Sequence, residues 1–157
     1  MNERDTILFE HAKNPLASLE TLAFICGNLL GSGYYRDVFE YNLDPKYVVK
    51  IQRDDAKFNN IVEWEIWNTV SYGSYKKHFA PCTWILGNGR ILIQRKTTPI
   101  SKRKPAPEKI PNFFTDVKDS NFGWIGNQFV AHDYDYTLVK LVDFGLTNKE
   151  KKYKSHI

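Results

Sequence analysis

The chain has 157 residues, of which 42% are hydrophobic and 15% aromatic, and its formal net charge is +4 at pH 7. This length and composition predict one folded domain with a buried core and exclude a disordered or fibrous chain. No apolar run approaches the roughly 18 residues of a membrane helix, and the first residues lack the apolar stretch of a signal peptide. Cys26 and Cys82 match no metal or redox spacing. We therefore expect a cytoplasmic protein with reduced cysteines and no membrane partner.

Two basic clusters, residues 102–104 and 149–154, carry much of the positive charge. Such clusters are usually solvated faces or flexible tails. No zinc-ligand spacing, RNA-binding aromatic motif or heptad repeat accompanies them. They therefore do not indicate a nucleic-acid partner.

The first 95 residues predict the order helix, strand, strand, helix, strand, strand. Asn14 as an N-cap and Pro15 at the first helical position predict a helix that continues to Cys26. Two strands are expected next, over residues 38–41 and 47–52, because both runs are rich in Val, Ile, Phe and Tyr.

Residues 59–72 predict an amphipathic helix, because Ile66 and Val70 fall on one helical face. Residues 82–95 predict a β-hairpin, since two apolar runs flank the turn at residues 87–89. The first half of the chain is therefore expected to combine an antiparallel sheet with helices.

Residues 99–111 contain four prolines, which exclude a continuous helix and predict a linker or an extended surface loop. A second hairpin is expected beyond it, with strands at 122–125 and 128–132 around a turn at Gly126. Residues from 147 onward predict a frayed basic tail.

The stretch LGSGYYRDVF, residues 30–39, places Gly31 and Gly33 between two strand-like runs. Glycines at such a position let the backbone turn sharply and approach a phosphate closely. A Gly-Ser-Gly turn is also an ordinary hairpin connection, so this motif is weak evidence on its own.

Lys50 ends the apolar run YVVK, where burial of an ammonium group is costly unless it meets an anion. Glu63 shares the apolar face of the following helix, so we expect it to pair with Lys50. Glu65, on the far side of the same helix, is the second choice.

The stretch FTDVKDSN places Asp116, Lys118 and Asn121 close together in a predicted loop. A loop of this kind, followed by a further Asp, can orient a hydroxyl group and hold a divalent metal against nucleotide phosphates.

In this chain order the motifs resemble those of protein kinases, most closely the very small serine/threonine kinase-like proteins of tailed bacteriophages. The resemblance covers residues 28 to about 135, and the Asp-x-Lys-x-x-Asn spacing is its most specific part. It implies an α+β fold in which a kinase-like N-lobe, an antiparallel sheet with one regulatory helix, precedes a catalytic-loop hairpin and a severely truncated C-lobe. The implied organisation is a single domain over 1–148, with an N-lobe (15–95), a hinge or linker (96–112), a catalytic and metal-loop segment (113–146) and a basic tail (147–157).

The resemblance also implies ATP and Mg²⁺ as ligands, and it assigns roles to individual residues. The implied catalytic residues are Lys50, Glu63, Asp116 and Lys118. The implied nucleotide-binding residues are Gly31, Ser32, Gly33, Val38, Lys50 and Gln94. The implied metal ligands are Asn121 and Asp133, with Asp143 as an alternative to Asp133.

The choice between Asp133 and Asp143 depends on spacing. Asp133 follows Asn121 by 12 positions (133 − 121), which is the usual kinase interval, whereas Asp143 follows it by 22 (143 − 121). We therefore favour Asp133, although Asp143 stands in a Val-Asp-Phe-Gly sequence like that of kinases.

Several features depart from the kinase pattern, among them Arg95, which stands where the hinge often has an acidic residue. Arg36 stands where kinases have a third glycine, and Phe114-Thr115 replaces the His-Arg pair before Asp116. Only 21 positions separate Arg95 from Asp116 (116 − 95), so the helices that normally support the catalytic loop do not fit there. The helix at 15–26 and a partner subunit both remain candidates for that support.

Three functions follow from these observations. The first is an ATP- and Mg²⁺-dependent phosphotransferase, phage-encoded and acting on a host protein in the host cytoplasm. The alternative is a catalytically weak or inactive pseudokinase that binds and modulates a host enzyme. The third, nucleic-acid binding, uses the tryptophans as stacking platforms, and we give it least weight because they fit core positions. These tryptophans are Trp64, Trp67, Trp84 and Trp124. The sequence indicates no oligomeric state.

Overall fold

The computed structural model describes residues 1–13, 17–53, 58–86, 88–137 and 149–155. It is an α+β protein whose paired strands are mostly antiparallel. The chain divides into two compact units: unit 1 is Met1–Trp64 with Cys82–Lys96, and unit 2 is Glu65–Pro81 with Thr97–Ile157. In the described ranges, none of the helices has the length and apolar character needed to span a bilayer.

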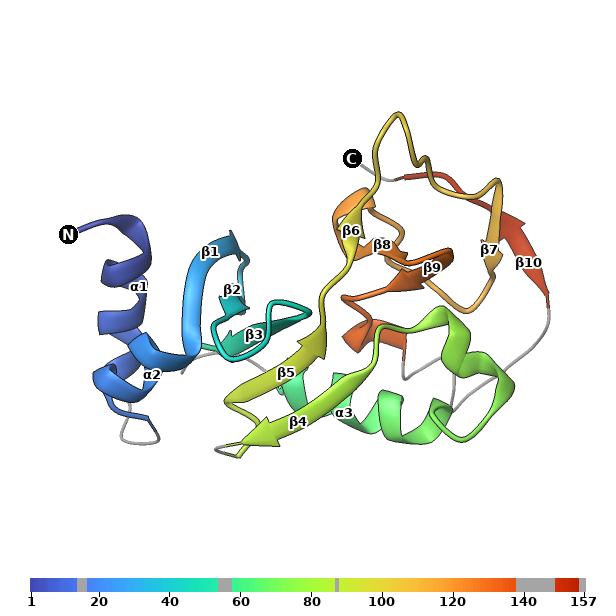
Figure 1. Cartoon of the computed structure of the whole chain (residues 1–157). Coiled ribbons are helices and arrows are strands. Elements are labelled where there is room, and N and C mark those ends of the chain that lie inside the picture. Colours follow the sequence, from blue (N-terminus) through green and yellow to red (C-terminus); the bar gives the residue numbers. More distant parts are fainter. Residues whose placement is uncertain (14–16, 54–57, 87, 138–148, 156–157) are drawn as a thin grey trace. The chain divides into compact units, whose positions relative to one another are not determined.

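Unit 1 is a five-stranded antiparallel sheet with strand order β1-β2-β3-β5-β4 (Figure 1). Its strands are β1 (Cys26–Ser32), β2 (Arg36–Tyr41), β3 (Tyr47–Gln52), β4 (Cys82–Leu86) and β5 (Ile91–Arg95). Its helices are α1 (Glu3–Ala12), α2 (Leu19–Ile25) and the first part of α3 (Asn59–Val70).

The two faces of this sheet carry different side chains, because successive side chains on a strand point to opposite sides. On one face α1 and α2 cover an apolar core (Figure 1). The buried residues of this core are Leu8, Leu22, Cys26, Phe39, Val49, Ile51, Ile91 and Ile93. Lys50 alternates with Val49 and Ile51, and its side chain therefore lies on the opposite face, in register with Val38 and Leu92.

The predicted strands at 38–41 and 47–52 and the hairpin at 82–95 are all present, and the helix predicted at 59–72 is α3. The helix predicted at 15–26 is shorter than expected. It spans Leu19–Ile25, and its N-cap is Ser18, whose hydroxyl accepts a hydrogen bond from the Thr21 N–H. Residues 14–16 lie outside the described residues.

Helix α1 of unit 1 was not predicted, and β1 was indicated only as a strand run without bounds before Gly31. In α1 the Asn2 side chain caps the first turn, and only Leu8 and His11 are buried. The guanidinium of Arg4 donates hydrogen bonds to the carbonyls of Cys26 and Gly27, which joins α1 to the end of α2. A helix held by so few apolar positions shows little helical periodicity in its sequence.

The described residues of unit 2 form two small sheets and three short 3₁₀ helices. The first sheet has the order β6-β8-β9, and the second pairs β7 with β10. The strands are β6 (Thr98–Pro99), β7 (Lys109–Pro111), β8 (Phe122–Ile125), β9 (Gln128–Ala131) and β10 (Glu150–Lys152). The 3₁₀ helices are η1 (Ser74–His78), η2 (Asp119–Asn121) and η3 (Asp135–Thr137).

The predicted hairpin after the linker is formed by β8 and β9. Gly126 lies in its turn with φ of +57°, a left-handed conformation that favours glycine. Stacked and edge-on aromatic rings form the core of this unit. The most buried of these rings belong to Phe79, Phe113, Phe114, Phe122 and Tyr134.

The prediction of a frayed tail from residue 147 is wrong for the described residues at that end. Glu150–Lys152 forms β10, which pairs antiparallel with β7 through Lys151 opposite Ile110. The charged sequence of this strand gives no apolar alternation, so only its pairing partner identifies it as a strand.

Candidate functional site

The predicted ion pair between Lys50 and Glu63 is present in unit 1. Lys50 Nζ on β3 lies 2.9 Å from Glu63 Oε2 on α3. Both side chains are buried, with residue exposures of 3% and 0%. Glu65 is exposed, so of the two candidate glutamates Glu63 is the partner of the lysine.

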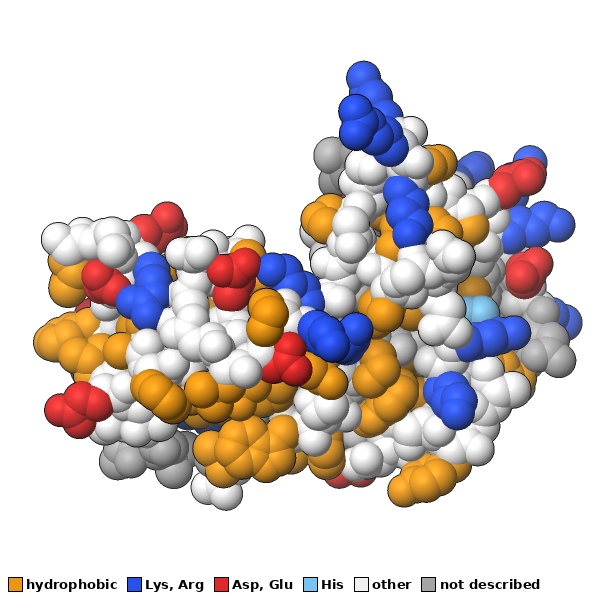
Figure 2. All heavy atoms as spheres, viewed as in Figure 1, with side chains coloured by type: hydrophobic (Ala, Val, Ile, Leu, Met, Phe, Trp, Pro, Cys, Tyr) orange, Lys and Arg blue, Asp and Glu red, His pale blue; other side chains and the backbone are white. Residues whose placement is uncertain are grey.

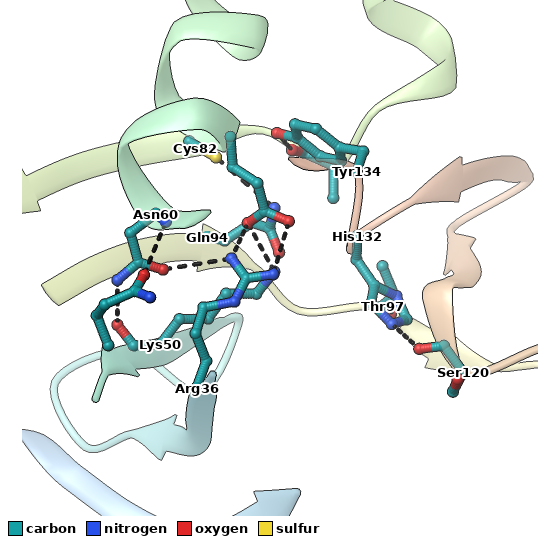
Figure 3. A network of polar contacts seen from close by, with 12 residues as sticks. Arg36, Lys50, Asn60, Cys82, Gln94, Thr97, Ser120, His132 and Tyr134 are labelled. Atoms are coloured by element: carbon teal, nitrogen blue, oxygen red, sulfur yellow. Dashed lines mark hydrogen bonds and ion pairs between the residues drawn. The ribbon is translucent and has the colours of Figure 1, made fainter. Parts of the chain in front are cut away.

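Arg36 adds a second cation to the same carboxylate (Figure 3). Its Nη1 lies 2.8 Å from Glu63 Oε2, and its Nη2 donates to Oε1 at 3.2 Å. Arg36 is the first residue of β2 and is buried. The sequence indicated only that Arg36 stands where kinases have a third glycine. The structure shows that it aligns Glu63 from a third element.

Asn60 and Gln52 hold α3 against the sheet through buried hydrogen bonds. The Asn60 side-chain amide donates to the carbonyls of Lys50 and Arg90, both at 3.1 Å. Gln52 Oε1 accepts from the Asn60 N–H at 3.0 Å, and Asn60 Oδ1 accepts from Arg36. Polar groups buried together in this way fix one geometry when all are satisfied, so the backbone that carries Lys50 has a fixed position relative to Glu63.

The glycine-rich turn joins β1 to β2. Gly31 lies opposite Val38, and a Cβ added at Gly31 would meet no atom within 4 Å. The Gly33 N–H donates to the carbonyl of Arg36 at 2.8 Å and closes the turn. Packing within the described chain therefore does not explain the glycine at position 31.

Ser32 takes part in a polar network on the other side of β2. Its hydroxyl donates to Asp37 Oδ1 at 2.6 Å, and His11 Nε2 lies 2.7 Å from Asp37 Oδ2. Arg53 Nη2 lies 2.7 Å from Asp37 Oδ1. Burial raises the pKa of Asp37, but the hydrogen bonds from His11 and Ser32 and the charge of Arg53 outweigh it and hold the pKa below 3.8. The turn is thus tied to α1 through a charged Asp37.

Gln94, predicted to contact the nucleotide, is completely buried on β5. Its Nε2 lies 3.6 Å from Cys82 Sγ, while its Oε1 is buried and accepts no hydrogen bond within the described part of the chain. A buried acceptor of this kind usually has a partner, which is commonly water or a ligand when it is not protein.

In unit 2 the structure brings together the three polar residues of the Asp-x-Lys-x-x-Asn motif. Asn121 Nδ2 donates to Oδ2 and to the carbonyl of Asp116, at 2.9 and 3.0 Å. Lys118 Nζ lies 3.2 Å from Asp116 Oδ1. Because the Asn121 amide nitrogen faces Asp116, its Oδ1 points away from that residue.

Asp133 is held beside this loop. The N–H groups of His132 and Asp133 both donate to the Asn121 carbonyl, at 2.9 and 3.3 Å. His132 Nε2 donates to the carbonyl of Ser120 at 2.7 Å, and its Nδ1 is hydrogen-bonded to the Thr97 hydroxyl at 2.8 Å (Figure 3). A carbonyl only accepts, which assigns the imidazole proton to Nε2.

Tyr134 anchors the segment that carries Asp133. Its ring packs edge-on against Phe79 at 5.0 Å between centroids, and its hydroxyl donates to the carbonyl of Ala80 at 2.9 Å. Phe114, two residues before Asp116, packs against Phe79 and Phe122. Within unit 2, aromatic packing therefore supports the loop. Asp143, the alternative metal ligand, lies outside the described residues.

No protein-family model matches this chain, and a search of the curated proteins finds no match. Residues of the predicted site fall into two groups. Unit 1 holds Gly31, Ser32, Gly33, Val38, Lys50, Glu63 and Gln94, and unit 2 holds Asp116, Lys118, Asn121 and Asp133.

Proposed function

We propose that this chain is a minimal kinase-like phosphotransferase that transfers the γ-phosphoryl group of ATP to a hydroxyl of a protein, with Mg²⁺ as its metal. The observation that carries the proposal is the buried Lys50–Glu63 ion pair, with Nζ to Oε2 at 2.9 Å. Burial of an ammonium is costly, and a carboxylate that fixes its direction suits the task of binding phosphate.

Nucleotide binding is further supported by Gly31 and Gln94. Open space around Gly31 fits close approach of a phosphate to the backbone. The buried Oε1 of Gln94 lacks a donor in the described chain, and we propose that neighbouring side chains move when the base binds and expose it to the exocyclic amino group of adenine. We assign the phosphates to the glycine-rich turn and Lys50, and the base to Gln94.

The donor set of unit 2 fits Mg²⁺, which prefers carboxylate and carbonyl oxygens. Asn121 can offer its Oδ1 to the metal, because its side-chain nitrogen is hydrogen-bonded to Asp116. Asp133 can offer its carboxylate, since its backbone N–H is hydrogen-bonded to the Asn121 carbonyl. When bound, the metal neutralises charge on the phosphate oxygens.

Asp116 is the proposed base. Its carboxylate accepts the proton of the substrate hydroxyl while the oxygen–phosphorus bond forms and the bond from phosphorus to the ADP oxygen breaks. Lys118 Nζ, 3.2 Å from Asp116 Oδ1, is suited to stabilise charge on the transferred group. Asn121 fixes the orientation of Asp116 through two hydrogen bonds.

The resemblance to small kinase-like proteins of bacteriophages supports a more specific role. We propose that the chain is phage-encoded and that its substrate is a protein of the host cell, modified in the host cytoplasm.

The test compares wild type with Asp116→Asn in transfer of labelled γ-phosphate from ATP to a lysate of a candidate bacterial host. The Asn side chain keeps an oxygen acceptor for Asn121, so the loop and nucleotide binding should persist while transfer falls about a hundredfold or more. Equal transfer by both proteins would exclude Asp116 as the base.

A second candidate, a kinase-shaped module that binds a host enzyme without chemistry, is favoured by one feature of unit 1. The edge strand β4 exposes Trp84 by 49% and Leu86 by 41%. Figure 2 shows hydrophobic side chains gathered over this strand. Thermal shift measurements separate the candidates, because a pure binding module gains no stability from ATP with Mg²⁺.

A further inference from the structure

Residues 149–155, hereafter the C-terminal clamp, contact unit 2 along the segment that leads into the proposed catalytic loop. Antiparallel pairing of β10 with β7 holds the first half of the clamp. The Asn112 N–H donates to the Lys149 carbonyl at 3.0 Å, and the Tyr153 N–H donates to the Glu108 carbonyl at 2.9 Å. The clamp is therefore attached by backbone hydrogen bonds along most of its length.

Side chains of the clamp then reach the loop itself. Lys151 Nζ donates to the carbonyl of Phe114, two residues before Asp116. The Tyr153 hydroxyl donates to Asp119 Oδ1 at 2.8 Å, and the Asp119 N–H donates to Ser155 Oγ at 3.2 Å. The clamp thus holds both the side chain and the backbone of Asp119.

Tyr153 also has a fixed ring position. Its ring packs edge-on against Phe122 and Phe129, with centroids 5.9 and 5.8 Å away. Burial, the hydrogen bond to Asp119 and the charge of Asp119 raise the pKa of Tyr153 well above its ordinary value. The hydroxyl therefore stays protonated at neutral pH and remains a donor to Asp119.

Asp119 lies between Lys118 and Asn121, where η2 begins. The backbone angles of Asp119 set the direction in which these two neighbours project. Because the Asp116–Asn121 hydrogen bonds span only this short loop, a shift of Asp119 would misplace Asn121 relative to Asp116. Displacements of about 1 Å in such groups lower catalytic rates strongly.

We propose that the C-terminal clamp is a built-in positioning device for the loop of Asp116, Lys118 and Asn121, with the Tyr153 hydroxyl as its principal contact. The catalytic part of this inference rests on the proposed phosphotransfer. The structural part, ordering of the loop by the clamp, does not.

The test uses the full chain with Tyr153→Phe, which removes the hydroxyl and keeps the ring contacts. Tyr72→Phe is the matched control, because Tyr72 is in the same unit and 96% exposed. Asp119→Asn is the conservative variant, since its amide oxygen still accepts from Tyr153. Amide hydrogen exchange at residues 116–121, followed by NMR, reports the order of the loop without any need for activity.

In Tyr153→Phe we expect exchange at residues 119–121 to accelerate about tenfold, the effect expected for one hydrogen bond to a charged acceptor. Exchange in β3 of unit 1 should not change. The kcat of phosphotransfer should fall about tenfold, and KM for ATP should change less than kcat, because the groups assigned to the phosphates and the base lie in unit 1 and are intact. Asp119→Asn should stay within about threefold of wild type in both measurements, since it retains the acceptor.

Exchange in Tyr153→Phe equal to that in Tyr72→Phe would overturn the inference, and so would faster exchange with unchanged kcat. If the wild-type protein transfers no phosphate, the exchange measurement alone decides whether the clamp orders the loop. Absence of phosphate transfer would reject the proposed function, and the exchange measurement would then test the structural inference independently.

Discussion

The Glu63 carboxylate forms ion pairs with two buried cations. Lys50 Nζ lies 2.9 Å from Glu63 Oε2, and Arg36 Nη1 lies 2.8 Å from the same oxygen. The three side chains come from a helix and two strands, so the position of α3 and the direction of the lysine depend on each other. This arrangement makes the contributions of the two partners separable by mutation.

Glu63→Gln should lower the free energy of unfolding by about 3–5 kcal/mol, because it leaves two buried cations without their carboxylate. Lys50→Met should cost less, since Glu63 keeps Arg36, yet it should abolish ATP binding. Chemical denaturation and ATP titration measure the two effects. Glu65→Gln, on the exposed side of α3, is the control and should behave as wild type. A larger loss of stability in Lys50→Met than in Glu63→Gln would contradict this account.

Gly31→Ala tests whether the glycine serves a ligand. Because the added Cβ meets nothing within 4 Å, the stability of the fold should be unchanged or slightly higher. Affinity for ATP with Mg²⁺ should fall about tenfold if a phosphate approaches the backbone there. The thermal shift at several ATP concentrations gives both values. Gly73→Ala, whose Cβ would make only an ordinary contact at 3.9 Å, is the matched control.

Gln94→Met should stabilise the protein while weakening nucleotide binding. The substitution removes a buried oxygen that accepts no hydrogen bond in the described chain, and such an atom costs about 1–3 kcal/mol. It also removes the proposed acceptor for adenine. Unfolding and ATP titration of one protein preparation report the two effects, and an unaltered ATP affinity would refute the role assigned to Gln94.

The lowered pKa of Asp37 predicts that the folded protein loses stability in acid. Burial raises its pKa, but the hydrogen bonds from His11 and Ser32 and the charge of Arg53 bring it below 3.8 in the folded protein. The stability that this carboxylate supplies is therefore complete above about pH 4, near its unfolded pKa, and is lost as pH falls through the folded pKa.

The corresponding measurement is unfolding of wild type and Asp37→Asn between pH 2.5 and 7. The variant should be less stable at neutral pH and should show a shallower decline below about pH 4, because it lacks this titration. If the free energy of unfolding fell in parallel for the two proteins below pH 4, Asp37 would not contribute to the loss of stability in acid.

Local patterns predicted much of the fold and of the candidate site. Enrichment in Val, Ile, Phe and Tyr identified β2 and β3, and the apolar face of α3 selected Glu63 over Glu65 as the partner of Lys50. The Asp-x-Lys-x-x-Asn spacing predicted the convergence of Asp116 with Asn121. These features depend on neighbours along the chain, which a single sequence displays.

The unpredicted features depend on contacts between distant segments. His11 meets Asp37 across 26 positions, and Arg36 meets Glu63 across 27. Nothing in the sequence near Arg36 distinguishes a buried guanidinium from an exposed one at a hairpin end. For β10, three charged residues give no strand signal, and only pairing with β7 orders them.

Cys26, at the junction of α2 and β1, provides a chemical probe for local unfolding of unit 1. It is completely buried in the apolar core, and burial raises the pKa of its thiol to about 12. Alkylating reagents attack the thiolate, so at neutral pH the folded protein presents almost no reactive sulfur there. Labelling of Cys26 must wait until the helices and the sheet separate locally, and its rate therefore reports the free energy of that opening.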